Sequence, residues 1–189
     1  NISFTHTLKF NTNNWKTALV YVMLNTWQTK IIALSLSILP SKITAGPIIG
    51  NKAPDFSLLD QDGIIRNLSD FKGRKLVVYF FPKADTPGWI KQACGFRDEY
   101  DKFEKYNISI LGVSYDKINT LKAFREKYKL KFNLLSDLKR IMGKSYGVNR
   151  YYFFPRRKTF LINENGILVH VYDEVNLRTH PDEILKYFN

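Results

Sequence analysis

The stretch Tyr79-Phe-Phe-Pro82-Lys-Ala-Asp-Thr86-Pro-Gly-Trp89-Ile-Lys-Gln-Ala-Cys94-Gly-Phe-Arg97-Asp98 runs from a buried strand into a helix. It begins inside the continuous apolar run 75–81, which is typical of a central strand covered on both faces. Thr86 is a residue type that favours a helix N-cap, and Pro87 suits the first helical position. Ala93, Phe96, Tyr100 and Phe103 follow at helical spacing and predict a face that packs on the strand. A strand joined to a helix in this way indicates an α/β domain.

The sequence from Gly50 onward predicts the other elements of this domain. One hairpin is expected at 56–59 and 65–68 around Asp62-Gly63, and another at 159–162 and 167–172 around Asn165-Gly166. Further strands are expected at 108–114 and 134–137, and helices over 121–128, 138–146 and 181–188. This order fits a thioredoxin-like fold, in which a central mixed sheet is flanked by helices. The predicted domain covers residues 49–189.

Residues 1–48 form an N-terminal extension of different composition. They contain no Asp or Glu, and they carry apolar stretches at 18–24 and 31–39, followed by Pro40 and Gly46-Pro47. The stretch 31–39 is too short to cross a bilayer, and a span over 18–39 would enclose Asn25, Gln28 and Lys30. The alternatives are a segment that docks on a partner or membrane, a leader of the export or organelle type, and a membrane span.

The charge of the chain favours anionic partners. It carries 29 basic and 17 acidic residues, a formal net charge of +12. An acidic protein face or a charged membrane suits this charge. No recognition motif or compact Lys/Arg run supports nucleic acid as a partner.

The sequence predicts no metal and no cofactor. Its single cysteine excludes an intramolecular disulfide and a thiolate-rich metal site. His6, His170 and His180 are scattered and are expected at the surface. There is no glycine-rich phosphate loop.

The quoted stretch closely resembles the active-site segment of the peroxiredoxins, and most closely that of the peroxiredoxin Q type, also called bacterioferritin comigratory protein. The resemblance covers about residues 49–188. Five further stretches are similar to sequence motifs that peroxiredoxin Q proteins have at the corresponding positions. They are Ala53-Pro-Asp-Phe56, Leu68-Ser-Asp-Phe-Lys-Gly73, Leu135-Ser-Asp137, Tyr146-Gly-Val148 and Thr159-Phe-Leu-Ile162. The resemblance implies a thioredoxin-like fold and a thioredoxin-dependent reduction of hydrogen peroxide and organic hydroperoxides.

The resemblance also assigns the site residues. The thiol that attacks peroxide would stand at residue 89, where this chain has Trp89. Thr86 and Arg157 would hold the peroxide, with Arg156 as the alternative register for the arginine, and Pro82 would shield the pocket. Indole does not attack peroxide and cannot form the sulfenic acid that the chemistry requires. Trp89 is therefore expected to fill the peroxide pocket or to anchor an interface.

Cys94 falls at the position of the resolving cysteine. Five helical residues separate it from residue 89, which places the two Cα atoms about 8–9 Å apart in an intact helix. A disulfide requires less than about 7 Å, so active members must unwind this helix locally. In this chain Cys94 is either a small buried side chain or a reactive thiol. Ile90 stands where the family has threonine, so the departure is not confined to one residue.

Three functions are open to this sequence. The first is a peroxiredoxin-like protein that has lost peroxidase activity and serves as a binding or structural subunit, with a plastid or thylakoid membrane complex as the suggested partner. The second is an active thiol peroxidase in which residue 89 is natively cysteine or selenocysteine. The third makes Cys94 itself the peroxide-reactive thiol.

Overall fold

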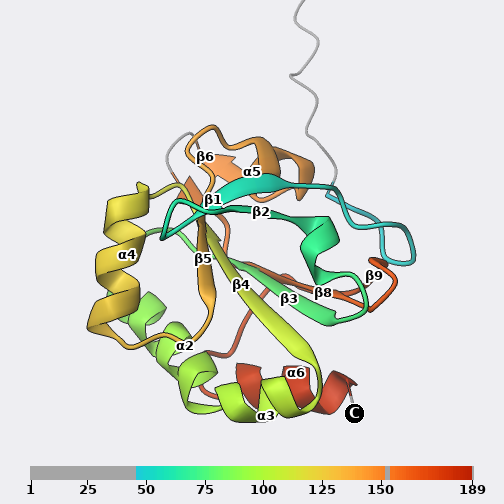
Figure 1. Cartoon of the computed structure of the whole chain (residues 1–189). Coiled ribbons are helices and arrows are strands. Elements are labelled where there is room, and N and C mark those ends of the chain that lie inside the picture. The colour runs from blue at the N-terminus through green and yellow to red at the C-terminus, as the bar shows by residue number, and fades with distance from the viewer. Residues whose placement is uncertain (1–45, 152–153, 189) are drawn as a thin grey trace, which may run out of the picture. The chain divides into compact units, whose positions relative to one another are not determined.

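A computed structural model describes residues 46–151 and 154–188 of the chain, and within this part it forms a seven-stranded mixed sheet (Figure 1). The strand order is β2-β1-β5-β4-β3-β8-β9. These strands are β1 (Ser57–Asp60), β2 (Ile65–Asn67), β3 (Lys75–Phe80), β4 (Ile108–Ser114), β5 (Asn133–Ser136), β8 (Lys158–Ile162) and β9 (Leu168–Tyr172). β3 is central: it pairs parallel with β4 and antiparallel with β8.

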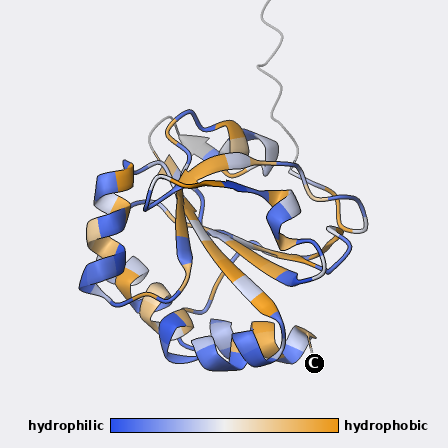
Figure 2. Ribbon diagram, viewed as in Figure 1, coloured by the Kyte–Doolittle hydropathy of each residue, from blue (hydrophilic) through white to orange (hydrophobic). Residues whose placement is uncertain are grey.

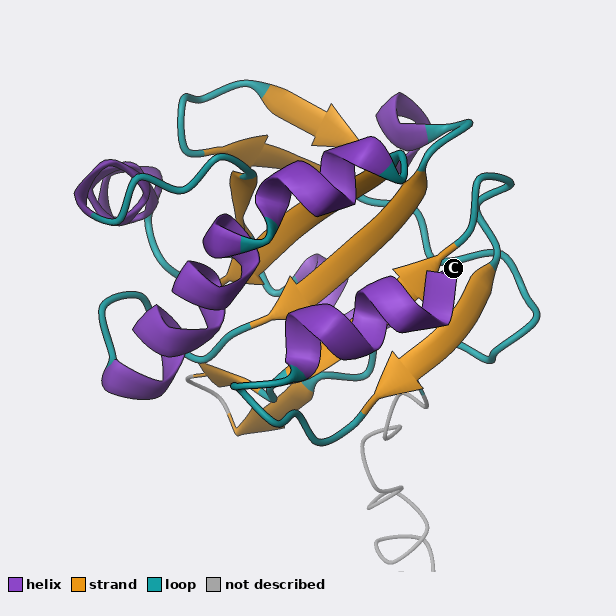
Figure 3. Cartoon of the chain, turned by 90° about the horizontal axis from the view of Figure 1, so that it is seen from below, coloured by secondary structure: helices purple, strands orange, loops and turns teal. Residues whose placement is uncertain are grey.

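Helices cover both faces of this sheet. They are α2 (Pro87–Asp98), α3 (Tyr100–Lys105), α4 (Ile118–Lys127), α5 (Ile141–Ser145) and α6 (His180–Phe188). One core cluster joins Val77 and Tyr79 of β3 to α2, α3, α4 and α6, and Figure 3 shows α2 and α6 side by side on that face. The other joins Val78 and Phe80 to α5 and to the segment before β1. Successive side chains of β3 therefore pack into two cores, one on each face of the sheet. A central mixed sheet flanked by helices confirms the predicted fold class. Apolar residues follow the central strands while the outer faces of the helices are hydrophilic (Figure 2).

Several predicted boundaries differ from the structure. The helix expected to run through Phe103 is interrupted at Glu99, whose backbone (φ −96°, ψ 4°) separates α2 from α3. The helix expected over 138–146 is the shorter α5. The Asp137 carboxylate accepts hydrogen bonds from the amides of Ile141 and Gly143, so it fixes where α5 begins. A short 3-10 helix η1 (Leu68–Phe71) and a small antiparallel pair, β6 (Asn149–Tyr151) with β7 (Phe154–Pro155), were not expected.

The predictions for residues 1–45, including the docking segment, the leader and the span over 18–39, lie outside the described residues. Among the residues that the structure describes, no helix has both the length and the apolar character needed to cross a membrane.

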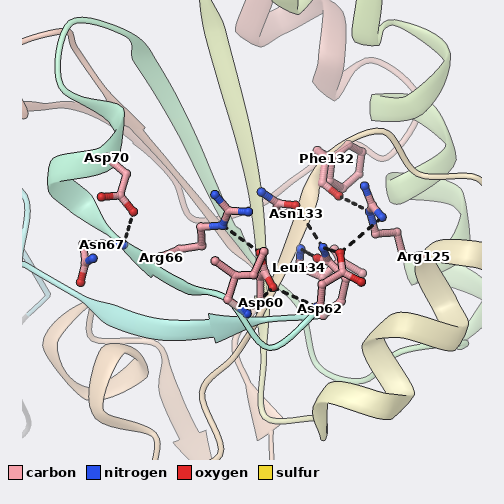
Figure 4. Close-up of polar contacts among 11 residues, drawn as sticks. Asp60, Asp62, Arg66, Asn67, Asp70, Arg125, Phe132, Asn133 and Leu134 are labelled. Carbon is pink, nitrogen blue, oxygen red and sulfur yellow. Dashed lines mark hydrogen bonds and ion pairs between the residues drawn. The ribbon is translucent and has the colours of Figure 1, made fainter.

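The β1–β2 hairpin is held by a buried carboxylate (Figure 4). Asp60 is fully buried, and its carboxylate accepts hydrogen bonds from the amides of Asp62 (2.9 Å) and Ile64 (3.0 Å). Its second oxygen accepts from Arg66 Nε at 2.8 Å. Gln61, also buried, ties the same turn to β5, because its side-chain oxygen accepts from the Leu134 amide at 2.8 Å. The turn is thus anchored by polar groups that have little access to water.

We expect Asp60→Ala to lower the free energy of unfolding by about 2–4 kcal/mol, because it removes a buried charged acceptor that satisfies three donors. Urea unfolding measures this change. Asp70→Ala is the matched control: Asp70 is exposed and accepts from the Asn67 amide at 2.8 Å, so the expected loss is about 1 kcal/mol or less. Equal losses in the two variants would contradict the anchoring role of Asp60.

Candidate active site

The site segment lies at the end of β3 and the start of α2. Pro82 is half-buried just beyond β3, and Thr86 occupies the N-cap of α2 with extended backbone dihedrals (φ −99°, ψ 148°). The predicted helix start is confirmed. The Thr86 hydroxyl does not cap the helix, however, because it donates to the Lys83 carbonyl at 3.2 Å and makes no bond to the amides of α2.

The indole of Trp89 lies in the core rather than at the surface. Trp89 has no exposed area and stacks on Phe81 with a centroid distance of 3.5 Å and an interplanar angle of 8°. Its ring also contacts Tyr79 (centroids 5.0 Å) and Phe124 (centroids 6.0 Å). A side chain without exposed surface cannot anchor an interface, so that expectation for Trp89 was wrong. What stands at the attacking position is part of an aromatic cluster.

Several buried polar atoms around Trp89 have no hydrogen-bond partner among the described residues. They are the indole Nε1, the Tyr79 hydroxyl and both polar atoms of the Gln92 side chain. Burial raises the pKa of Tyr79 well above its usual value, and the nearby Cys94 adds to this effect. An unpaired buried donor or acceptor costs about 1–3 kcal/mol. The sequence interpretation missed Gln92, because glutamine on a helix usually faces solvent.

Arg157 reaches the start of α2 from the residue before β8. Its side chain is half-buried, and Nη1 donates to the Gly88 carbonyl at 3.2 Å, next to Trp89. A Cβ at residue 88 would lie 3.3 Å from Arg157 Nη2, so glycine permits this close approach. Arg156 is exposed, and its amide donates to the Val148 carbonyl at 2.7 Å. The geometry therefore places Arg157, and not Arg156, beside residue 89.

Cys94 lies on α2 and is half-buried with a free thiol. Arg97, whose guanidinium pairs with Asp98, and the buried Tyr79 lie near Cys94. α2 continues without interruption from Trp89 through Cys94. Within the described part of the chain, no group of three or more His, Cys, Asp or Glu side chains could hold a metal ion.

His180 is buried, so the prediction that it lies at the surface was wrong. It begins α6 and is covered by Phe96 and Tyr172, with ring centroids at 5.7 and 4.9 Å. Its Nε2 lies 2.9 Å from the Thr159 hydroxyl. Burial lowers the pKa of His180 from 6.5 to about 4, Arg157 lowers it further, and Glu183 opposes the shift.

This burial predicts a loss of stability in acid. Between pH 6.5 and about 4 the unfolded chain binds a proton at His180 that the folded chain excludes. The free energy of unfolding therefore falls as pH decreases through that window, by up to about 3 kcal/mol from this residue. Urea unfolding at several pH values, for the parent and for His180→Gln, measures the effect. The two curves should converge as pH falls, and a constant difference between them would contradict a buried neutral imidazole.

A family model identifies the larger part of the chain. The model of the AhpC/TSA family matches residues 49–171. This range contains the whole site segment together with Arg157.

Individual relatives agree with this match. "Peroxiredoxin Q, chloroplastic" of Oryza sativa subsp. japonica is 43% identical over 150 residues, which cover 77% of this chain and 69% of that protein. "Peroxiredoxin Bcp" of Escherichia coli (strain K12) is 42% identical over 145 residues, covering 73% of this chain and 93% of that protein. Among solved structures, peroxidoxin BcpB of Mycobacterium tuberculosis superposes with a TM-score of 0.70 at 32% identity, covering 74% of this chain and 95% of that one. A PrxQ mutant of Xylella fastidiosa gives a TM-score of 0.72 at 28% identity, with 76% and 96% covered. With this fold, this segment and these relatives, the chain belongs to the AhpC/TSA family and is of the peroxiredoxin Q and Bcp type.

Proposed function

We propose that the protein with tryptophan at residue 89 has no thiol peroxidase activity and works as a binding or structural subunit. The observation that carries this proposal is the replacement of the attacking thiol by an indole that is fully buried and stacked on Phe81. Neither feature allows attack on a peroxide. Pro82, Thr86 and Arg157 are then what remains of the family's peroxide site.

The proposed partner is an anionic surface of a larger assembly, either an acidic protein face or a charged membrane. The net charge of +12 supports this choice. A plastid is the proposed compartment, because plant relatives are named chloroplastic, although bacterial relatives exist as well. More specifically, we propose that the partner is a thylakoid membrane complex and that residues 1–48 and the basic surface contact it. A domain that elutes alone from size-exclusion chromatography of native extract would count against it.

The comparisons support a second candidate more directly: a thioredoxin-dependent thiol peroxidase that reduces hydrogen peroxide and organic hydroperoxides. The relatives described above carry peroxiredoxin or peroxidoxin names, and the unpaired polar atoms around Trp89 suit a smaller, polar residue. This candidate requires cysteine or selenocysteine at residue 89. Cysteine and tryptophan codons differ by one base, and a UGA codon for selenocysteine can be translated conceptually as tryptophan.

In the second candidate, one peroxide is reduced at the expense of two groups on the protein, the thiol or selenol at residue 89 and the thiol of Cys94. The thiolate or selenolate at residue 89 attacks one peroxide oxygen, the O–O bond breaks, and the other oxygen leaves as water or an alcohol. Cys94 then attacks the sulfenic or selenenic acid and releases water. Thioredoxin reduces the resulting bridge by thiol exchange. Closing that bridge requires α2 to unwind between residues 89 and 94.

Peptide mass spectrometry of the native protein, before and after mild peroxide, separates these candidates. Trypsin releases peptides 84–91 and 92–97 separately, so residue 89 and Cys94 report independently. A tryptophan mass at residue 89 with unmodified Cys94 supports the inactive binding protein. A cysteine or selenocysteine mass, oxidised or bridged to Cys94, establishes the peroxidase. Tryptophan at residue 89 together with oxidised Cys94 would favour Cys94 as the reactive thiol.

A further inference from the structure

α5 and the residues just before it expose apolar side chains to water. Leu138, shortly after β5, is 54% exposed, and Ile141, the first residue of α5, is 65% exposed. The inner side of α5 is anchored, because Met142 is buried in the core cluster on that face of the sheet. Single exposed apolar residues are ordinary on protein surfaces, so the neighbours of these two decide what they mean. We name the following residues the α5 face: Leu138, Lys139, Arg140, Ile141 and Lys144.

Three cations accompany the two apolar side chains. Lys139 and Lys144 are exposed, and the half-buried Arg140 places its guanidinium 5.5 Å from the ring centroid of Tyr115. None of the three forms an ion pair with a carboxylate of the described residues. Their charges are therefore free to meet an anionic partner.

Acidic residues do not offset this charge at the surface. The sequence from 138 to 163 contains seven Lys or Arg residues and no Asp or Glu. Asp137 directly precedes this stretch, but its side chain is fully buried and its carboxylate accepts hydrogen bonds from the amides of Ile141 and Gly143. The α5 face therefore presents positive charge and apolar area together.

The described part of the chain begins beside this face (Figure 1). A Cβ at residue 46 would lie 3.1 Å from the carbonyl oxygen of Tyr146, the residue that ends α5. Ile48 and Ile49 follow and are exposed. The 45 residues before this point contain four Lys, no Asp or Glu, and the apolar stretches 18–24 and 31–39. The segment that joins the domain next to α5 thus has the same cationic and apolar character.

We propose that the α5 face binds the surface of an anionic lipid bilayer. Leu138 and Ile141 enter the boundary between headgroups and acyl chains, while Lys139, Arg140 and Lys144 pair with headgroup phosphates. Surfaces that combine aliphatic side chains with Lys and Arg bind membranes in this way. Each such cation near an anionic bilayer strengthens binding about fivefold, and the buried aliphatic side chains add to it.

Two other partners fit the α5 face less well. Protein–protein interfaces are depleted in lysine and depend on large buried anchors, whereas this face has lysines beside two aliphatic side chains. A second copy of this chain in a symmetric contact would bring cations of the same sign together. A bilayer accepts separate aliphatic side chains and supplies the opposite charge along its whole surface.

Co-sedimentation of the recombinant full-length chain with vesicles tests the proposal. Vesicles of phosphatidylglycerol and phosphatidylcholine in equal parts supply the anionic surface, and vesicles of phosphatidylcholine alone are the neutral control. We expect the parent to bind the anionic vesicles at least about tenfold more tightly than the neutral ones. Added salt should weaken this binding, because it screens the exposed lysines.

Paired lysine variants assign the binding to the α5 face. Lys139→Gln combined with Lys144→Gln should bind the anionic vesicles at least about tenfold more weakly than the parent. Lys91→Gln combined with Lys105→Gln is the matched control and should stay within about threefold. Lys91 and Lys105 are also exposed, but they lie on α2 and α3, which cover the other face of the sheet.

Paired isoleucine variants test the apolar part. Ile141→Ser should weaken binding at least about threefold, whereas Ile65→Ser should leave it unchanged. Ile65 is 58% exposed and pairs with Leu59 of β1. The preceding Leu58 packs on the core cluster beneath α5, so Leu59 and Ile65 point to the opposite face of the sheet.

Four results would overturn the proposal: no binding of the parent to anionic vesicles, equal binding to both kinds of vesicle, binding that salt does not weaken, or unchanged binding after Lys139→Gln with Lys144→Gln. The salt series needs no variant, and circular dichroism checks that each variant is folded.

This inference rests on the proposed function, since it chooses the charged membrane over the acidic protein face. The two fail in different ways. Absence of vesicle binding removes the membrane and leaves an acidic protein face as the proposed partner. A cysteine or selenocysteine mass at residue 89 of the native protein removes the inactive binding protein, whatever the vesicles show.

Discussion

Replacing Trp89 with alanine is expected to lower the free energy of unfolding by about 3–5 kcal/mol. The indole has no exposed area and fills the space between Phe81, Tyr79 and Phe124. Its removal therefore loses both buried apolar area and the stacking contacts, and it leaves a cavity that the sheet and α4 cannot readily close. Urea unfolding followed by circular dichroism measures the change.

Two further variants make this result specific. Phe154→Ala removes an aromatic ring that is 48% exposed, so we expect a change of about 1 kcal/mol or less. Trp89→Phe keeps an aromatic ring in the stack and removes the unpaired indole N–H, so we expect a loss smaller than that of Trp89→Ala. A Trp89→Ala variant as stable as the parent would show that the indole is not a core side chain.

Trp89→Cys is expected to create a peroxide-reactive thiol. The thiol would stand in the first turn of α2, where the positive end of the helix and the nearby Arg157 guanidinium favour the thiolate. We expect hydrogen peroxide to oxidise it about a hundredfold faster than it oxidises Cys94 in the parent. Stopped-flow oxidation followed by mass spectrometry of the peptide 84–91 measures the rate.

The role of Arg157 is tested in the same background. Trp89→Cys combined with Arg157→Gln should react about a hundredfold more slowly than Trp89→Cys alone, while Arg156→Gln should leave the rate unchanged. Because the new cysteine leaves a core cavity, circular dichroism must first show that each variant is folded. A folded Trp89→Cys protein that reacts no faster than Cys94 would mean that the site around residue 89 has lost more than its thiol. That result would strengthen the binding role over the peroxidase.

The elements near the site were largely predictable from local patterns. The apolar run of β3, the N-cap at Thr86 and the spacing of Ala93 and Phe96 on α2 lie within one continuous segment. The break at Glu99 and the late start of α5 at Ile141 were not predictable in the same way. The break at Glu99 reflects the backbone at one residue, and the start of α5 reflects hydrogen bonds that the amides of Ile141 and Gly143 donate to the Asp137 carboxylate.

The site itself was predictable as a set of residues but not as an arrangement. Thr86 and Arg157 were identified by resemblance, yet the bond of Arg157 to the Gly88 carbonyl joins residues 69 positions apart. Gln92 was missed because glutamine usually faces water, and His180 was wrongly expected at the surface; only the surroundings of these two residues bury them.

The amino-acid sequence alone determines the α/β class, the family and the absence of a thiol at residue 89, because each of these depends on residue type and short-range spacing. The direction of the Trp89 indole, the burial of His180 and the bond of Arg157 to the Gly88 carbonyl depend on the folded chain. These properties arise where β3, β8, α2, α4 and α6 meet. Burial and pairing at that junction are set by contacts between segments that are distant in the chain, and such contacts exist only once the core has formed.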